Sequence, residues 1–306
     1  MPLRLAVCAA SLLAAATGFQ GAQPPPDGRI AAMLARVSEE AEVFRMTAVK
    51  MLAQETLEQR ALKPPRRVRP RLGKAPLPPP KPEYRTRVIV SEYGFSTFRE
   101  APNALHELRQ VVSVDGRRVA SQEKARRTLT IGLRSEDDAL KKRMLEDFEK
   151  HGLVGAVTDF GQVLLLFARR RLDDYSFRLE GAGMVGAEAA TIFHFQQRGG
   201  PGALLIFEKR KAIHQPLEGQ LWVRRSDWRP LRVVLRSATK QGERVTRHEA
   251  TVDYVLSHHG VLVPVSVVHR QFVGPDLVVE NVFRYSPFRL FSADSEMKFS
   301  EPAPGK

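Results

Sequence analysis

The sequence predicts an α+β protein in which helices cover one face of a large antiparallel sheet. Runs of β-branched and aromatic residues recur between residues 84 and 285, and Gly or Pro marks the turns between them. Apolar and polar side chains alternate within these runs, so one face of the sheet is apolar and must be buried. Two helical patterns, at residues 30–62 and 121–151, can supply the covering layer.

Residues 1–22 are expected to be a signal peptide. Arg4 precedes an apolar run from Leu5 to Ala16, and small residues follow as far as Ala22. The run spans about 18 Å as a helix, short of the roughly 30 Å bilayer core, which favours cleavage over anchoring. We therefore expect export to the periplasm or cell envelope of a bacterium.

Cysteine content and charge limit the chemistry of the exported chain. The one cysteine, Cys8, lies in the leader, and Val7 stands where lipoprotein processing needs a small residue. The mature chain would therefore have no thiol for a disulfide, thiol catalysis or Cys-ligated zinc. The net charge of +14 favours anionic lipids or other envelope polyanions as partners over nucleic acid, with a merely solvated basic surface as the alternative.

The segment before the sheet divides into a helix and a linker. After a Pro-rich spacer, Ile30–Leu62 has no Pro or Gly, and residues 23–62 are expected to form an N-terminal amphipathic helix. Its apolar stripe is expected to pack on the sheet, although a membrane-surface or coiled-coil role is open. Residues 63–83 contain eight prolines among Arg and Lys, which predicts a stiff basic linker or a polyanion tether. The helical stripe consists of Leu34, Val37, Ala41, Phe44, Ala48, Met51 and Leu52.

Residues 84–300 are expected to form the sheet domain, with one or two helices at about 121–151. Val163–Phe167 fits either a buried helix or a core strand. Even spacing of the later strands predicts an antiparallel meander. The predicted strands are Tyr84–Phe98, Leu105–Val114, Arg117–Ala120, Tyr175–Leu179, Ala189–Gln196, Ala203–Glu208, Gly219–Val223, Leu231–Ser237, Glu249–Leu256, Leu262–Phe272 and Leu277–Tyr285.

Three phrases in Tyr175–Phe291 carry a family resemblance. They are the strand-Gly-turn-Gly-strand pattern from Tyr175, the hairpin that begins Gly219-Gln-Leu-Trp222, and the closing Phe283-Arg-Tyr285. Together they resemble the superfamily of LolA-type and LolB-type lipoprotein carriers, which includes outer-membrane lipoprotein-sorting-like proteins. The resemblance implies a curved half-barrel closed by helices around a cavity for acyl chains. The linker and the charged segment 121–151 depart from that pattern and favour a separate envelope branch.

The predicted function is non-enzymatic binding of an apolar ligand, such as lipid or lipoprotein acyl chains, between sheet and helices. The chain lacks a nucleophile elbow, a zinc-protease motif and a dinucleotide fingerprint, so no catalytic residue, cofactor or metal site is predicted. The alternative is a structural or interaction protein of the envelope that meets a protein partner or polyanion through its helix and linker; a hydrolase ranks third. Alternation and resemblance select Phe177, Phe193, Trp222, Leu235, Tyr254 and Phe283 as cavity lining, and each also fits simple core packing.

Overall fold

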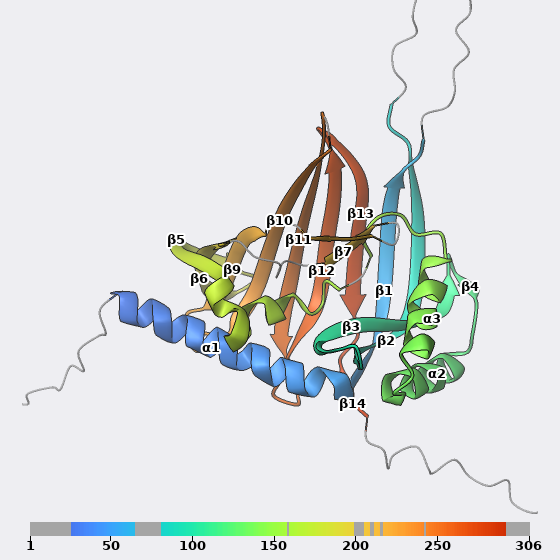
Figure 1. Cartoon of the computed structure of the whole chain (residues 1–306), viewed down its shortest axis with the longest axis horizontal. Helices are drawn as coiled ribbons and strands as arrows, with labels where there is room; N and C mark the ends of the chain where they lie inside the picture. The colour runs from blue at the N-terminus through green and yellow to red at the C-terminus, as the bar shows by residue number, and fades with distance from the viewer. Residues whose placement is uncertain are drawn as a thin grey trace, which may run out of the picture.

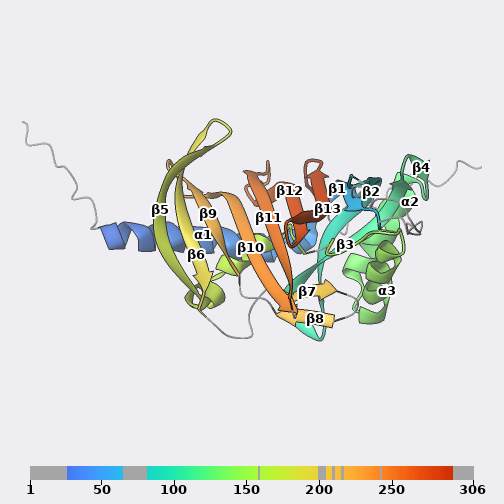
Figure 2. The same ribbon diagram turned by 90° about the horizontal axis from the view of Figure 1, so that it is seen from above.

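A twelve-stranded sheet forms the body of the protein. The computed structural model describes residues 26–64, 81–157, 159–198, 205–208, 211–214, 217–241 and 243–291, so the predicted signal peptide and most of the predicted linker lie outside the described residues. The strand order is β4-β3-β2-β1-β13-β12-β11-β10-β9-β6-β5, with β14 beside β1, and every pairing is antiparallel. Figures 1 and 2 show the sheet curving, with α1 crossing it along one side. The predicted fold class, α+β with a curved antiparallel sheet, is confirmed.

The elements follow the predicted order except that β1 replaces the second half of a predicted helix and that two short strands, β8 and β14, are additional. The helices are α1 (Pro26–Thr47), η1 (Ala48–Lys50), α2 (Gln122–Arg134), α3 (Asp138–Glu149), η2 (Val163–Phe167) and η3 (Arg169–Asp174). The strands are β1 (Met51–Leu62), β2 (Tyr84–Phe98), β3 (Ala101–Val114), β4 (Arg117–Arg118), β5 (Tyr175–Val185), β6 (Glu188–Gln197), β7 (Leu205–Glu208), β8 (Lys211–His214), β9 (Glu218–Arg224), β10 (Pro230–Gln241), β11 (Arg244–Leu256), β12 (Leu262–Val273), β13 (Asp276–Tyr285) and β14 (Arg289–Leu290).

The predicted helix over Ile30–Leu62 is wrong in its second half. The α-helix ends at Thr47, and Met51–Leu62 is β1, paired with β2 on one side and β13 on the other. Ala, Leu, Gln and Glu favour helices, but this preference amounts to a few tenths of a kcal/mol per residue, and pairing along both edges outweighs it. The alternation of Glu55, Leu57, Gln59 and Ala61 inward with Thr56, Glu58 and Arg60 outward was the signal for a strand.

The two faces of the sheet differ in what covers them. We call the face that carries Leu57 and Phe283 the inner face; α1 packs on it through residues such as Val37 and Phe44, which are fully buried. The helices α2 and α3 pack mainly on the opposite, outer face, where Leu129 and Met144 meet Leu52 and Leu108. The expectation that both helical segments cover one face is therefore wrong for residues 121–151. Of the two alternatives for Val163–Phe167, the buried helix is confirmed, and it is the 3-10 helix η2.

Candidate functional site

A continuous apolar row crosses the inner face. Val233 pairs with Val252, Val252 with Val267, Val267 with Phe283, Phe283 with Leu57, and Leu57 with Ile89. All six side chains are at most 1% exposed, so this row is the centre of the core. Because residues paired across antiparallel strands share a face, the row places apolar surface across six strands.

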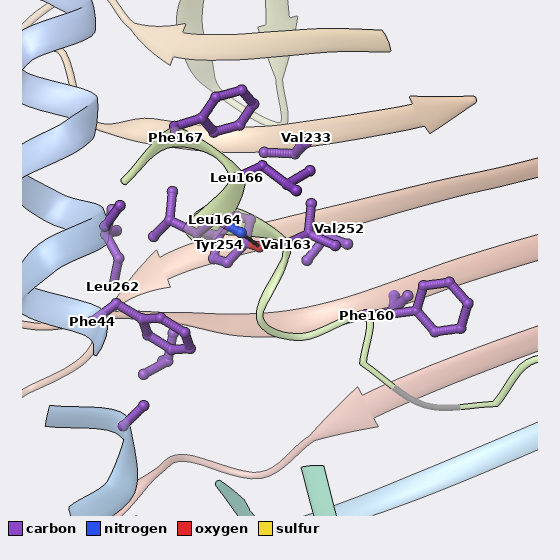
Figure 3. Close-up of a cluster of buried hydrophobic side chains, with 14 of the residues drawn as sticks. Phe44, Phe160, Val163, Leu164, Leu166, Phe167, Val233, Val252, Tyr254 and Leu262 are labelled. Carbon is purple, nitrogen blue, oxygen red and sulfur yellow. Dashed lines mark hydrogen bonds between the residues drawn. The ribbon is translucent and has the colours of Figure 1, made fainter. Parts of the chain in front are cut away.

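The described residues of Leu153–Asp174, which we call the cover, lie over this face together with α1. Figure 3 shows η2 placed over Val233, Val252 and Tyr254, with Phe44 and Leu262 nearby. Leu164 is fully buried, and its backbone N–H donates a 2.9 Å hydrogen bond to the hydroxyl oxygen of Tyr254. Burial raises the pKa of Tyr254, so the phenol stays protonated. The protein's own side chains thus occupy the inner face at this place.

The first part of the cover is held by buried amides on β1 and β13. The Gln59 side chain donates to the Val154 carbonyl at 3.0 Å and accepts from the Val154 N–H at 2.8 Å. Asn281 Nδ2 donates to the Ala156 carbonyl at 2.9 Å, and Gln59 Nε2 donates to Asn281 Oδ1 at 2.7 Å. Because Gln59 and Asn281 are paired across the sheet, they fix the cover in one register.

A buried histidine pair adjoins these amides. His248 Nδ1 lies 3.1 Å from His269 Nε2, and the His269 ring stacks on Phe160 of the cover at 4.5 Å between centroids. Burial, with a further contribution from His248, lowers the pKa of His269 to about 3. His269 is therefore neutral at physiological pH and acts here as a packing and hydrogen-bonding group.

A buried group of three carboxylates and one arginine holds the second part of the cover. Arg109 donates to Glu55 at 2.6 and 2.8 Å and to Glu107 at 2.7 Å. Glu107 in turn accepts from the backbone N–H of Asp159 at 2.9 Å and of Gly161 at 2.6 Å. A Cβ at Gly161 would lie 2.7 Å from the Tyr93 hydroxyl and 2.9 Å from Glu107 Oε1, so glycine lets the cover approach this closely.

The charges of this group do not balance. Asp159 belongs to the group as a third acid, because its side chain accepts the Glu107 N–H at 3.4 Å. Three carboxyl groups therefore share one guanidinium, that of Arg109. Burial, and next the nearby Glu107 carboxylate, raise the pKa of Asp159 to about 7. Burial likewise raises the pKa of Glu55, although Arg109 opposes the shift. The group can therefore take up a proton near neutral pH.

Five of the six predicted lining residues lie on the inner face. Phe193, Leu235, Tyr254 and Phe283 are at most 3% exposed, and Phe177 is half-buried against them. Trp222 lies on the outer face, because its neighbour Leu221 pairs with Phe193; its ring sits 5.9 Å from the Arg232 guanidinium carbon. The prediction that Trp222 faces inward missed a signal in the sequence, which is that Leu221 and Val223 of β9 are the inward residues on either side of it.

Sequence reasoning did not select the polar groups that hold the cover. Glu55 and Gln59 fell within the predicted helix, and Glu107 and Arg109 fell within a predicted strand without any signal that they face inward. Within the described part of the chain, no group of three or more His, Cys, Asp or Glu side chains could hold a metal ion. No helix there is long and apolar enough to cross a bilayer.

Comparison with solved structures finds distant matches that cover most of the chain. A LolA superfamily protein from Nitrosomonas europaea is 11% identical with a TM-score of 0.36, over 85% of this chain and 94% of that one. A DUF1329 family protein from Desulfovibrio piger is 12% identical with a TM-score of 0.37, over 89% and 97%. An outer membrane lipoprotein-sorting protein domain from Vibrio parahaemolyticus is 10% identical with a TM-score of 0.33, over 86% and 94%. No family model and no curated protein matches the chain. Similarity at this level leaves function to be inferred from the site itself.

Proposed function

We propose that the protein is an exported, non-enzymatic binder of an apolar ligand, such as the acyl chains of a lipid or lipoprotein. The ligand would lie on the inner face in place of η2. The observation that carries this proposal is the apolar row across six strands, over which short 3-10 turns and loop lie between the sheet and the long helix α1.

Displacement of the cover would have to be coupled to ligand entry. Exposing one large apolar side chain such as Val252 or Phe283 costs about 1.5–3 kcal/mol. An open state without a ligand is therefore unfavourable, whereas an acyl chain restores the burial that η2 provides. The polar anchors at Gln59, Asn281 and Glu107 stay on the sheet when the cover leaves, and they then present hydrogen-bonding groups beside the apolar row.

The test is native mass spectrometry, with lipid extraction, of protein purified from a periplasm without detergent. Glu107→Gln weakens two backbone anchors of the cover and should increase lipid occupancy over the wild type. Glu92→Gln is the matched control, because Glu92 is equally buried but accepts hydrogen bonds from Gln122 and Arg126 on the outer face. A clean unliganded mass for all three chains in the presence of added lipid would refute the proposal.

The filled inner face also supports a second candidate, a structural or interaction protein of the cell envelope. In this case the cover is permanent core, and Glu107→Gln only lowers stability. Fully buried Phe193 and Phe283 fit this alternative as well as they fit the first. Affinity capture by the wild-type chain of one specific envelope protein, together with absence of lipid, would favour it.

A further inference from the structure

Exposed apolar side chains gather at one end of the molecule. Of the eleven large hydrophobic residues that are exposed in the described ranges, seven lie on the ends of α1, α2, β11, β12 and β14. We call these seven the rim. They are Val43, Met46, Ile131, Val255, Leu256, Val265 and Leu290, and their exposed fractions run from 37% to 58%.

Backbone pairing and packing bring these element ends together. Leu290 pairs with Met51 directly after the α1–η1 segment, and the Phe291 N–H donates to the Lys50 carbonyl at 3.0 Å. The Arg134 guanidinium carbon lies 5.4 Å from the Phe291 ring centroid, which brings the last turn of α2 to the same place. The β11–β12 turn starts beyond the Leu256–Leu262 pair, and Leu262 belongs to the same core cluster as Phe44 of α1. Figure 1 shows these ends along the lower side of the molecule.

The rim carries exposed cations without a salt bridge and is bounded by acids on one side. Lys50, Arg284 and Arg289 are exposed, and none of them has a salt bridge to another described residue. The neighbouring acids are already paired with bases: Glu39 with Arg36 at 2.9 Å, Glu42 with Arg45 at 2.8 Å, and Asp253 with Arg232 at 2.5 Å. The acidic turn at Glu136–Asp138 follows α2 and bounds the rim on that side.

From this combination we propose that the rim docks on an anionic lipid bilayer. Apolar side chains that reach the interface, with Lys and Arg beside them, gain both burial and attraction to anionic head groups. A protein groove would bury the apolar groups but would need its own acids opposite Lys50, Arg284 and Arg289. This docking does not depend on a ligand at the inner face, so an experiment can refute it without refuting the function proposed above.

The test is flotation of the whole exported chain with vesicles of phosphatidylcholine alone and of phosphatidylcholine mixed with phosphatidylglycerol. We expect binding only to the anionic vesicles, weakening as salt rises. Two variants address the rim: Met46→Glu with Leu290→Glu, and Lys50→Glu with Arg289→Glu. The variant at Lys50 and Arg289 should lower the affinity about tenfold or more, since each basic residue near an anionic surface contributes about 1 kcal/mol. The variant at Met46 and Leu290 should lower it by a similar factor, because it replaces apolar burial with two carboxylates that anionic head groups repel.

Met184→Glu is the matched control. Met184 is 57% exposed on β5, away from the rim, and its substitution should leave vesicle binding unchanged. Three results would overturn the proposal: a wild type that does not bind anionic vesicles, rim variants that bind them as well as the wild type, or a Met184→Glu variant whose vesicle binding falls as much as that of the rim variants. The second result would place binding elsewhere, such as in the basic segment 63–83. If the double variant does not fold by circular dichroism, Met46→Glu alone replaces it, because that side chain is 58% exposed.

Discussion

Replacing Asp159 with Asn should stabilise the protein, and the gain should grow with pH. Asp159 sits in the cover with φ at 66°, a left-handed conformation that Asn tolerates well. Its pKa is raised from 3.8 to about 7 by burial and by Glu107. The folded state therefore binds more protons than the unfolded state between these values, and stability falls as pH rises through this window.

The size of the effect follows from the shift. At about 1.4 kcal/mol per pH unit, ionising Asp159 costs the wild type about 3 kcal/mol between pH 5 and pH 8, and the neutral Asn variant avoids this cost. Urea unfolding of both chains at the two pH values measures it. Asp173→Asn, in the exposed turn of η3, is the matched control for the loss of one carboxylate outside the buried group. A gain for Asp159→Asn that is equal at both pH values, or a loss that grows with pH, would refute the reasoning.

Three further substitutions test the packing of the inner face and its covers. Leu57→Ala should lower the free energy of unfolding by about 2–5 kcal/mol, because Leu57 is fully buried in the apolar row; urea unfolding measures this, and a loss below about 1 kcal/mol would contradict the described packing. Tyr254→Phe leaves the buried Leu164 N–H without its acceptor, so a loss of about 1–3 kcal/mol and faster hydrogen exchange of that amide are expected, and unchanged exchange would contradict the bond. Glu40→Ala removes the acceptor for Arg229 at 2.8 Å and should cost about 1–3 kcal/mol by thermal unfolding, whereas Glu39→Ala, at a 55% exposed side chain, should cost under about 0.5 kcal/mol.

The sequence was informative where periodicity was undisturbed. Tyr84–Phe98 is a strand with the predicted bounds, and the later meander follows the predicted order because Gly and Pro turns separate its strands. It failed at Met51–Leu62, where helix-forming residues are held in a strand by two neighbours that are distant in sequence. Alternation likewise placed Phe193 and Phe283 on the inner face. In β9, Leu221 and Val223 alternate with Trp222, and the prediction overlooked this signal for an outward Trp222.

Local pattern predicted that Val163–Phe167 of the cover is buried, but it did not predict what holds the cover in place. Its anchors depend on side chains from β1, β3 and β13 that meet only in the folded sheet, and neither spacing nor composition relates Glu107 to Asp159 or Gln59 to Val154. Buried carboxylates such as Glu55 look like surface residues in a sequence, because a Glu is rarely buried unless it is paired.

The position of β1 sets the order in which the chain can fold. Its pairing with β2 crosses only residues 63–83, so the β1–β2–β3 unit can assemble as soon as those residues are available. Its pairing with β13 joins residues far apart in sequence; the Gln54 N–H, for instance, donates to Ser286 Oγ across 232 positions. Until β13 arrives, one edge of β1 has unsatisfied hydrogen-bonding groups that can pair with other chains. High contact order of this kind slows folding. The pairing of β1 with β13 is therefore the step at which a chaperone or a competing strand would act.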